Sequence, residues 1–304
     1  MFDSKAKKII FDETTRYAEQ YMAKNHEYLQ QHKQARGHDW IRKPMVPKEV
    51  DALIAMVIAM GVVGLPTLRS YWSSQWPFAN DNFSFIMSSR RFELLMQFLH
   101  LNNSALQNGD RLYKIRPIMD CVIENFMKSY IPHREISIDE SIIAYKGRLS
   151  WIQYLPKKPH KWGLKAWVLA DATNGYVWNW RLYTGKEPRT DGVCLSHHVV
   201  LSLSSPLKGK GYEIYCDNFY SSPQLFATLL EEGFGACGTV RSNRKGLSKA
   251  FKTVKLKKGE VHSEKAAVDD SVLCLKWMDK RAVTLMSTLH DDTMVDVQRQ
   301  SRGA

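Results

Sequence analysis

Two aspartates, each carried by a short apolar segment, are the residues of this sequence best suited to chemistry. Asp139 lies within 135–143, where isoleucines alternate with polar residues as in a β-strand with one buried face. Asp217 ends a second such segment, 212–217, and a helix-like stretch follows it at 223–230. Carboxylates that converge from different elements can hold two divalent cations about 3.5 to 4 Å apart, as two-metal phosphoryl transfer requires. The pair therefore predicts a metal-dependent site that acts on phosphodiester bonds.

Each acid near a strand also has a structural explanation. Aspartate is unfavourable inside a strand unless something uses it, which favours a functional role for Asp139. Asp217 precedes Ser221 and Ser222, a position from which an acid often caps a helix. Strand alternation predicts that Glu140 points to the opposite face from Asp139 and is a structural acid. Turn chemistry explains the remaining acids near strand ends, which are Asp171 and Asp279.

The composition describes a basic chain with enough apolar residues for a sizeable core. The 304 residues include 43 Lys or Arg against 31 Asp or Glu, a formal net charge of +12, and 44% are hydrophobic. A surplus of this size favours a polyanionic partner, and nucleic acid is the commonest large one. A basic surface that serves only solubility is the alternative.

The cysteines and the apolar segments argue against other classes of protein. Five cysteines stand far apart without a Cys-x-x-Cys pair, which indicates a reducing compartment and argues against a zinc module in this chain. The longest apolar-rich run, 50–63, contains Asp51 and is too short to cross a bilayer. The N-terminus lacks the apolar core of a secretory signal. We therefore expect no membrane partner.

Two cation-rich stretches are candidates for contact with DNA. Six Lys or Arg and no acid lie in 141–170, interleaved with tryptophan and tyrosine rings as in nucleic-acid grooves. Eight Lys or Arg and no acid lie in 241–258. Such rings are more often core residues, and a charge run is often a solvated loop. The residues predicted to bind DNA are Lys146, Arg148, Lys157, Lys158, Lys161, Lys165, Arg241, Arg244, Lys245 and Lys249.

The apolar pattern changes from helical to strand-like near residue 134. Residues 1–133 are predicted to be a mainly helical DNA-binding or dimerisation region, and 134–240 to be a catalytic core. Three antiparallel strands followed by alternating helix and strand are typical of an RNase H-like mixed sheet, which makes the fold α/β (α+β). A basic insertion with a β-hairpin at 241–290 and a polar tail at 291–304 complete the division. The expected helices are 9–29, 47–60, 88–101, 115–130, 192–203 and 223–230, and the expected strands are 135–143, 149–155, 163–170, 176–183, 212–217 and 235–240.

Several motifs are similar to those of piggyBac-type transposases. They include Ser-Ile-Asp-Glu-Ser at 137–141, Tyr-Lys-Gly-Arg at 145–148, a lysine-rich segment at 154–165, and Tyr-Cys-Asp-Asn-Phe-Tyr-Ser at 215–221. Less specific matches occur between residues 68 and 101, so that the resemblance covers nearly all of the chain. The sequence is most similar to the piggyBac transposable element-derived proteins of animal genomes.

The resemblance implies an RNase H-like core in which three aspartates hold two Mg²⁺ ions. Asp139 and Asp217 match the first two positions and would be both metal ligands and catalytic residues. The third aspartate of the family lies in a Gly-Gly-Val-Asp type motif, which does not precede Asp291, Asp292 or Asp296 here. We therefore expect that this chain, whether a fragment, a truncated copy or an isoform, cuts DNA weakly or not at all.

The resemblance further implies strand cleavage and transfer at TTAA sites, a homodimer on DNA and a nuclear location. Two functions stay open on these grounds. One is a DNA transposase core, and the other is a non-catalytic, domesticated DNA-binding protein derived from a transposase. A carboxylate-pair hydrolase of another class explains neither the charge nor the motifs.

Overall fold

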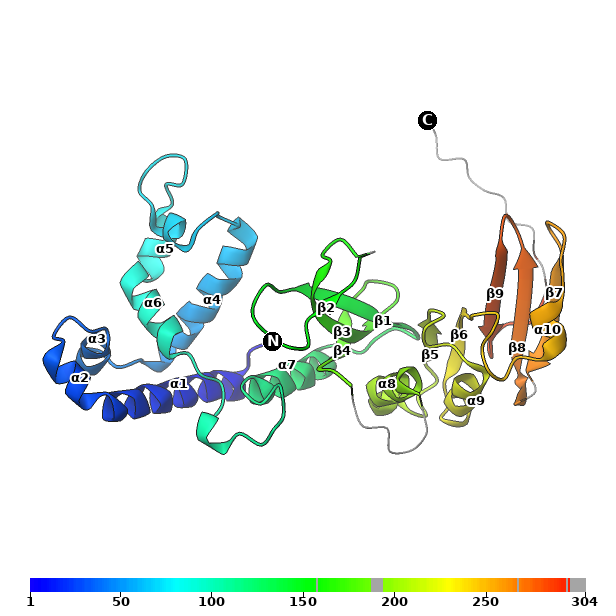
Figure 1. The fold of residues 1–304 in the computed structure, drawn as a ribbon, viewed down its shortest axis with the longest axis horizontal. Helices are drawn as coiled ribbons and strands as arrows, with labels where there is room; N and C mark the ends of the chain where they lie inside the picture. The colour runs from blue at the N-terminus through cyan, green and yellow to red at the C-terminus, as the bar shows by residue number, and fades with distance from the viewer. Residues whose placement is uncertain (157, 187–193, 267, 294, 296–304) are drawn as a thin grey trace. The chain divides into compact units, whose positions relative to one another are not determined.

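The chain folds into two compact units, which are shown in a computed structural model (Figure 1). The model describes residues 1–304 except 157, 187–193, 267, 294 and 296–304. The first unit, Met1–Lys128, is called the helical unit here, and the second, Ser129–Ala304, the sheet unit. Among the described residues, no helix combines the length and the apolar character needed to cross a membrane.

The helical unit is built from amphipathic helices around one apolar core. Ser88 caps the helix that follows it by accepting the amide hydrogen of Arg91 at 3.3 Å. Phe98 is fully buried at the centre of the core, where the rings of Tyr21 and Trp40 meet it edge-on. The helices are α1 (Ser4–Lys24), α2 (His26–Gln31), α3 (Gly37–Arg42), α4 (Pro47–Val63), α5 (Asp81–Ile86), α6 (Ser89–Phe98) and α7 (Arg116–Ser129), with short 3₁₀ helices at Leu68–Trp72 and Ser104–Leu106.

A mixed sheet organises the sheet unit, and the described residues of this unit contribute nine strands to it. Its order is β2-β3-β1-β5-β6-β9-β8-β7, with β4 also paired to β3. The pairs β1–β3 and β3–β4 are antiparallel, whereas β1–β5 and β5–β6 are parallel. The strands are β1 (Glu135–Ala144), β2 (Gln153–Tyr154), β3 (Trp162–Asp171), β4 (Val177–Leu182), β5 (Glu213–Cys216), β6 (Gly235–Thr239), β7 (Val261–Ala266), β8 (Asp269–Met278) and β9 (Ala282–Ser287). The helices of this unit are α8 (Leu195–Ser204), α9 (Pro223–Glu231) and α10 (Lys249–Thr253), with a 3₁₀ helix at Ser205–Leu207.

The sheet differs from the sequence prediction in two places. The strand expected at 149–155 shrinks to the two residues of β2, and Trp151 beside it is buried instead of lying in a strand. The hairpin of β8 and β9 is joined by β7, and β9 pairs with β6, so that 261–287 extends the main sheet. Hydrophobic alternation shows that a segment is a strand, but not which sheet edge it joins.

Gly238 allows β5 and β6 to lie closely side by side. A Cβ atom at this position would be 2.1 Å from the backbone oxygen of Cys216, a distance that no larger residue tolerates. Cys216 is the last residue of β5 and directly precedes Asp217. The glycine therefore helps to fix the strand end from which this carboxylate projects.

Candidate metal centre and nucleic-acid interface

Asp139 and Asp217 come together because of the register between two parallel strands. The pairing of β1 with β5 runs from Glu135 opposite Glu213 to Ile138 opposite Cys216. Asp139 and Asp217 are the next residues on the two strands, and parallel strands place such residues at the same sheet edge. On its other side β1 stays paired with β3, which holds Asp139 opposite Val168. The two acids therefore meet where β5 ends.

Glu140 joins this pair, although the sequence predicts that it points away. One carboxylate oxygen from each of Asp139, Glu140 and Asp217 lies within 4.8 Å of the others, and we call these residues the acid cluster. The expectation for the direction of Glu140 is wrong because β5 ends at Cys216, which leaves this edge of β1 open for the longer side chain. Lys158 Nζ lies 3.5 Å from Glu140 Oε1 and 3.2 Å from its backbone oxygen.

Short-range hydrogen bonds hold the two aspartates in place. Asp217 Oδ1 accepts the amide hydrogen of Phe219 at 2.9 Å, and the Ser221 hydroxyl donates to the Asp217 backbone oxygen at 2.9 Å. The cap of α9 is Ser222, which accepts the amide hydrogen of Leu225. Asp217 is thus not used as the cap of this helix. Asp139 Oδ1 accepts the amide hydrogen of Glu140 at 2.7 Å.

The acid cluster concentrates negative charge next to a buried hydroxyl. Burial raises the pKa of Glu140, and the hydrogen bond and charge of Asp139 raise it further. Tyr220 is 1% exposed, and burial together with the charges of Glu140, Asp139 and Asp217 raises its pKa. Its hydroxyl has no hydrogen-bond partner among the described residues. A bound cation would relieve the repulsion among the three carboxylates.

The donors of the acid cluster suit a hard cation. All three are carboxylate oxygens, which are the ligands that Mg²⁺, Mn²⁺ and Ca²⁺ prefer. Structural zinc sites use histidine and cysteine ligands instead. Within the described parts of the chain, this is the sole group of three His, Cys, Asp or Glu with the spacing for a metal ion. Asp291 and Asp292, near the end of the chain, do not belong to the acid cluster. Asp291 accepts the amide hydrogen of Thr293, and Asp292 accepts the Ser263 hydroxyl hydrogen. Asp296 is outside the described residues.

Four of the cations predicted to bind DNA surround the acid cluster. Lys158 contacts Glu140, and Lys165 Nζ lies 5.1 Å from the centre of the Phe219 ring. Arg241 Nε donates to Asn218 Oδ1 at 3.1 Å, and Arg244 donates to the backbone oxygen of Phe219 at 3.0 Å. The two arginines therefore tie the start of the basic segment to the loop that follows Asp217. The residues that share this placement are Lys158, Lys165, Arg241 and Arg244.

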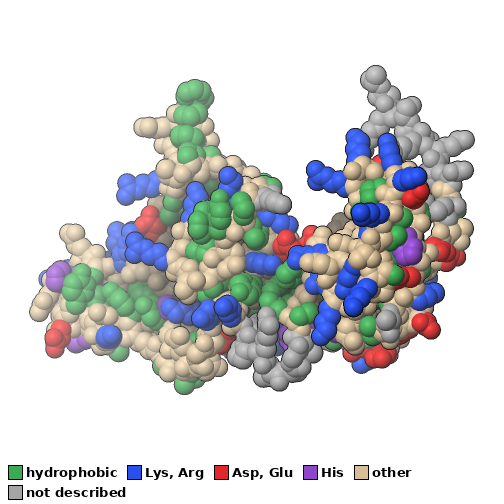
Figure 2. All heavy atoms as spheres, turned by 45° about the vertical axis from the view of Figure 1, so that its right-hand side comes forward, with side chains coloured by type: hydrophobic (Ala, Val, Ile, Leu, Met, Phe, Trp, Pro, Cys, Tyr) green, Lys and Arg blue, Asp and Glu red, His purple; other side chains and the backbone are tan. Residues whose placement is uncertain are grey.

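The other predicted contacts are placed differently. Lys146 and Lys161 line a cavity of about 810 Å³ together with Trp162, which is 60% exposed. Trp151 and Trp167 are buried, whereas Tyr154 and Trp162 are exposed. The interpretation that these rings are core residues therefore holds for only two of the four. Arg148, Lys245 and Lys249 are exposed, and Lys157 lies outside the described residues. Lysine and arginine side chains spread widely over the visible surface, with fewer acids among them (Figure 2).

The fold and the acid cluster together define a DDE-like transposase class, and comparison with known families agrees. The family model described as "Transposase IS4" matches residues 1–304, so the chain belongs to this piggyBac-like transposase family. The predicted relationship to piggyBac transposases is thereby confirmed.

Individual relatives extend this result. Human "PiggyBac transposable element-derived protein 3" is 29% identical over 255 residues, which cover 80% of this chain and 42% of the relative. Human "PiggyBac transposable element-derived protein 2" is 26% identical over 296 residues, which cover 94% of this chain and 46% of the relative. The chain thus spans less than half the length of these curated relatives.

A solved structure is similar to nearly the whole chain. The cryo-EM structure of a piggyBac transposase synaptic complex with hairpin DNA matches with a TM-score of 0.81 and 23% sequence identity. The match covers 97% of this chain and 60% of that chain. The predicted RNase H-like mixed α/β fold is confirmed by this similarity.

Proposed function

We propose that this chain is the DNA-acting core of a protein derived from a piggyBac-type transposase, with a divalent cation held by Asp139 and Asp217. The observation that carries the proposal is the meeting of these carboxylates, with Glu140, where β5 ends beside β1. Mg²⁺ is the expected cation, because phosphoryl-transfer sites commonly bind it through one or two carboxylates plus substrate phosphates. A bound cation would supply Lewis-acid stabilisation of a phosphoryl oxygen and activation of water.

The chain's own residues have separate roles in this proposal. Asp139 and Asp217 hold the cation, and Glu140 is a third carboxylate close enough to join them. Lys165, Arg241 and Arg244 lie beside the acid cluster and are proposed to hold the phosphates on either side of the scissile bond. The further proposed phosphate contacts are Lys146, Arg148, Lys157, Lys158, Lys161, Lys245 and Lys249.

The partner in this proposal is double-stranded DNA. The piggyBac structure that resembles this chain is a synaptic complex with hairpin DNA, and the net charge of +12 is the second support. Action at transposon ends and TTAA targets, a homodimer on DNA and a nuclear location are proposed by analogy with the family.

Strand cleavage by this chain alone is expected to be weak. Two-metal chemistry needs carboxylates spread over different elements so that two cations lie about 3.5 to 4 Å apart. In the acid cluster, Asp139 and Glu140 are neighbours on one strand, and Lys158 already contacts Glu140. This donor set suits one cation better than two. The same observation supports the second candidate function, a non-catalytic DNA-binding protein.

A cleavage assay separates the two candidates. The full chain is incubated with Mg²⁺ and a DNA donor bearing terminal repeats, beside Asp139→Asn, Asp217→Asn and the exposed control Asp270→Asn. We expect slow excision that both site variants abolish and the control retains. Robust excision that neither site variant reduces would show that the metal ligands are assigned wrongly. DNA binding without any excision by the unaltered chain would favour the non-catalytic candidate.

A further inference from the structure

Tyr220 lies beside the acid cluster without being one of its carboxylates. Its backbone amide donates to the backbone oxygen of Asp217 at 3.2 Å, which places Tyr220 in the turn that follows this aspartate. The side chain is 1% exposed, and its ring meets the Phe219 ring edge-on with 5.0 Å between the ring centres. The phenol is therefore held inside the sheet unit, close to the loop that carries Asp217.

The Tyr220 hydroxyl is buried without a hydrogen-bond partner among the described residues. Burial raises the pKa of Tyr220, and the negative charges of Glu140, Asp139 and Asp217, in this order, raise it further. A buried and unpaired hydroxyl destabilises a fold, so native structures rarely keep one without a function. Here the unpaired donor lies in the field of three carboxylates, each of which can accept its hydrogen.

Glu140 is held differently from the two aspartates of the acid cluster. Asp139 and Asp217 each accept a backbone amide hydrogen, whereas Glu140 contacts Lys158 and the Asp139 carboxyl. Burial and the neighbouring Asp139 raise the pKa of Glu140, and a cation among the three carboxylates would oppose this shift and favour ionised Glu140. An ionised carboxylate accepts several hydrogen bonds, and Tyr220 offers an unpaired donor beside it.

We propose that Tyr220 is a positioning residue of the metal centre, whose hydroxyl donates a hydrogen bond to Glu140 when Glu140 holds a cation together with the two aspartates. This inference rests on the proposed function, which supplies the cation, and adds a third ligand and the group that orients it. Carboxylates that bind metals are commonly oriented by such donors. A DNA phosphate is not the partner of this hydroxyl, because its oxygen is inaccessible to solvent.

The test compares Tyr220→Phe with Tyr71→Phe, a matched variant in the helical unit. Tyr71 is also buried, but its hydroxyl donates to the Met60 backbone oxygen at 2.8 Å and accepts the Leu65 amide hydrogen at 2.9 Å. Without metal, Tyr220→Phe should leave the midpoint of thermal unfolding unchanged or higher, because an unpaired hydroxyl is removed, whereas Tyr71→Phe should lower it. In calorimetric titrations of the full chain with Mn²⁺, Tyr220→Phe should bind at least about tenfold more weakly, and Tyr71→Phe should bind as the parent does.

A double-mutant cycle tests whether Glu140 is the acceptor. Glu140→Ala removes the proposed partner, so adding Tyr220→Phe to this variant should weaken Mn²⁺ binding by less than about threefold. The same loss of affinity in both backgrounds would show that the hydroxyl does not act through Glu140, which would overturn the inference. Circular dichroism confirms that all variants are folded.

Failure of the inference and failure of the proposed function give different results. Equal Mn²⁺ affinity of Tyr220→Phe and the parent chain, with weaker binding by Asp139→Asn and Asp217→Asn, would overturn the role of Tyr220 and leave the proposed metal centre standing. A lower unfolding midpoint of metal-free Tyr220→Phe would show that the hydroxyl is already paired without a cation, which also contradicts the inference. Mn²⁺ binding that none of these variants weakens would instead remove the proposed metal centre itself.

Discussion

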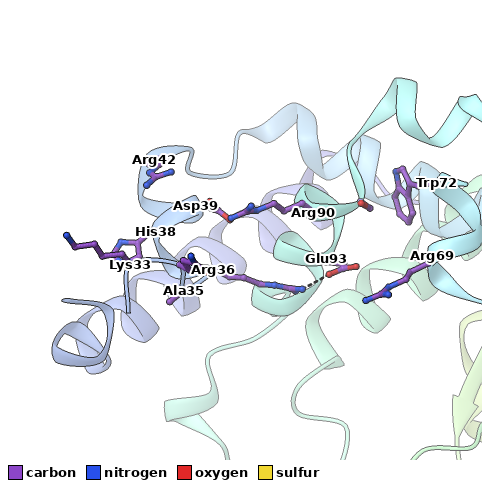
Figure 3. Close-up of a pocket in the computed structure, with 12 residues that line it drawn as sticks. Lys33, Ala35, Arg36, His38, Asp39, Arg42, Arg69, Trp72, Arg90 and Glu93 are labelled. Carbon is purple, nitrogen blue, oxygen red and sulfur yellow. Dashed lines mark hydrogen bonds and ion pairs between the residues drawn. The ribbon is translucent and has the colours of Figure 1, made fainter. Parts of the chain in front are cut away.

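In the sheet unit three acids gather at one strand edge, whereas in the helical unit Asp39 and Glu93 are each paired with an arginine in a cavity that is also lined by three exposed cations, Lys33, Arg42 and Arg69 (Figure 3). The first arrangement favours a cation, and the second favours an anion. Both occur in a chain whose net charge is +12. The comparison shows that net charge indicates a polyanionic partner, but that the placement of a few ion pairs decides which ligand each surface prefers.

A buried acid of the sheet unit, Asp171, and a half-buried acid of the helical unit, Glu49, are stabilised differently. Asp171 in the sheet unit accepts hydrogen bonds from the Thr173 hydroxyl, the Tyr130 hydroxyl and the His133 amide. Glu49 in the helical unit is held by the guanidinium of Arg91. Neighbouring hydrogen-bond donors therefore stabilise the ionised carboxylate of Asp171, whereas an ion pair with Arg91 stabilises that of Glu49.

The largest effect is expected from removing a core ring in one unit. Phe98→Ala deletes a fully buried side chain of the helical unit and should lower its free energy of unfolding by about 4 kcal/mol. Hydrogen exchange should accelerate in the helical unit and stay unchanged in the sheet strands, because the two units have separate cores. The exposed control Phe85→Ala should shift stability by less than about 0.5 kcal/mol. Equal acceleration of hydrogen exchange in both units would contradict the division of the chain into two units with separate cores.

Asp171→Asn should lower the stability of the sheet unit by about 3 kcal/mol at pH 7. Burial by itself raises the pKa of Asp171, but hydrogen bonds from Thr173, His133 and Tyr130 outweigh it and hold the pKa far below its usual value. A depressed pKa stabilises the fold above the unfolded value, about 3.9, and this stabilisation is lost as the pH falls further.

The measurement for this variant is urea unfolding at pH 7, 5 and 3. At pH 7 and pH 5, the free energy of unfolding of the parent chain should exceed that of Asp171→Asn by the full amount. At pH 3, this difference in free energy should be smaller. A difference that stays constant down to pH 3 would show that the carboxylate charge is not what the neighbouring donors stabilise.

A smaller effect is expected for the ion pair of the helical unit. Arg91→Lys keeps the charge but loses the two-pronged contact with Glu49, which should cost about 1 to 2 kcal/mol. Burial raises the pKa of Glu49, and the hydrogen bond and charge of Arg91 reverse this shift to a lowered pKa. Arg90→Lys, at a more exposed pair, should cost less than about 0.5 kcal/mol by thermal unfolding. Similar costs for both variants would contradict the special role of Arg91.

Local patterns in the sequence predict much of the fold. The helix expected at 88–101 contains α6, and the strands expected at 163–170 and 176–183 correspond to β3 and β4. The sequence analysis predicts that Asp139 and Asp217 converge from two strands of an RNase H-like sheet, and the parallel pairing of β1 with β5 brings them together. These features depend on nearby residues or on chain order, so they are accessible from sequence.

The features that the sequence did not reveal depend on tertiary packing. Glu140 reaches the acid cluster because β5 ends before it, and strand alternation contains no information about where a neighbour ends. The adjacent Asp-Glu pair was a signal that the cluster holds more than two acids. Only the packing of the helical unit brings four cations from separate segments around one cavity: Lys33, Arg42, Arg69 and Arg90.

The most direct test of the account is a titration of the full chain with Mn²⁺, followed by the electron paramagnetic resonance signal of the free ion. The account predicts about one site per chain, competed by Mg²⁺, with affinity reduced at least about tenfold in Asp139→Asn and Asp217→Asn and unchanged in Asp270→Asn. Equal Mn²⁺ affinity in all four proteins would contradict a metal centre formed by the middle of β1 and the residue that follows β5.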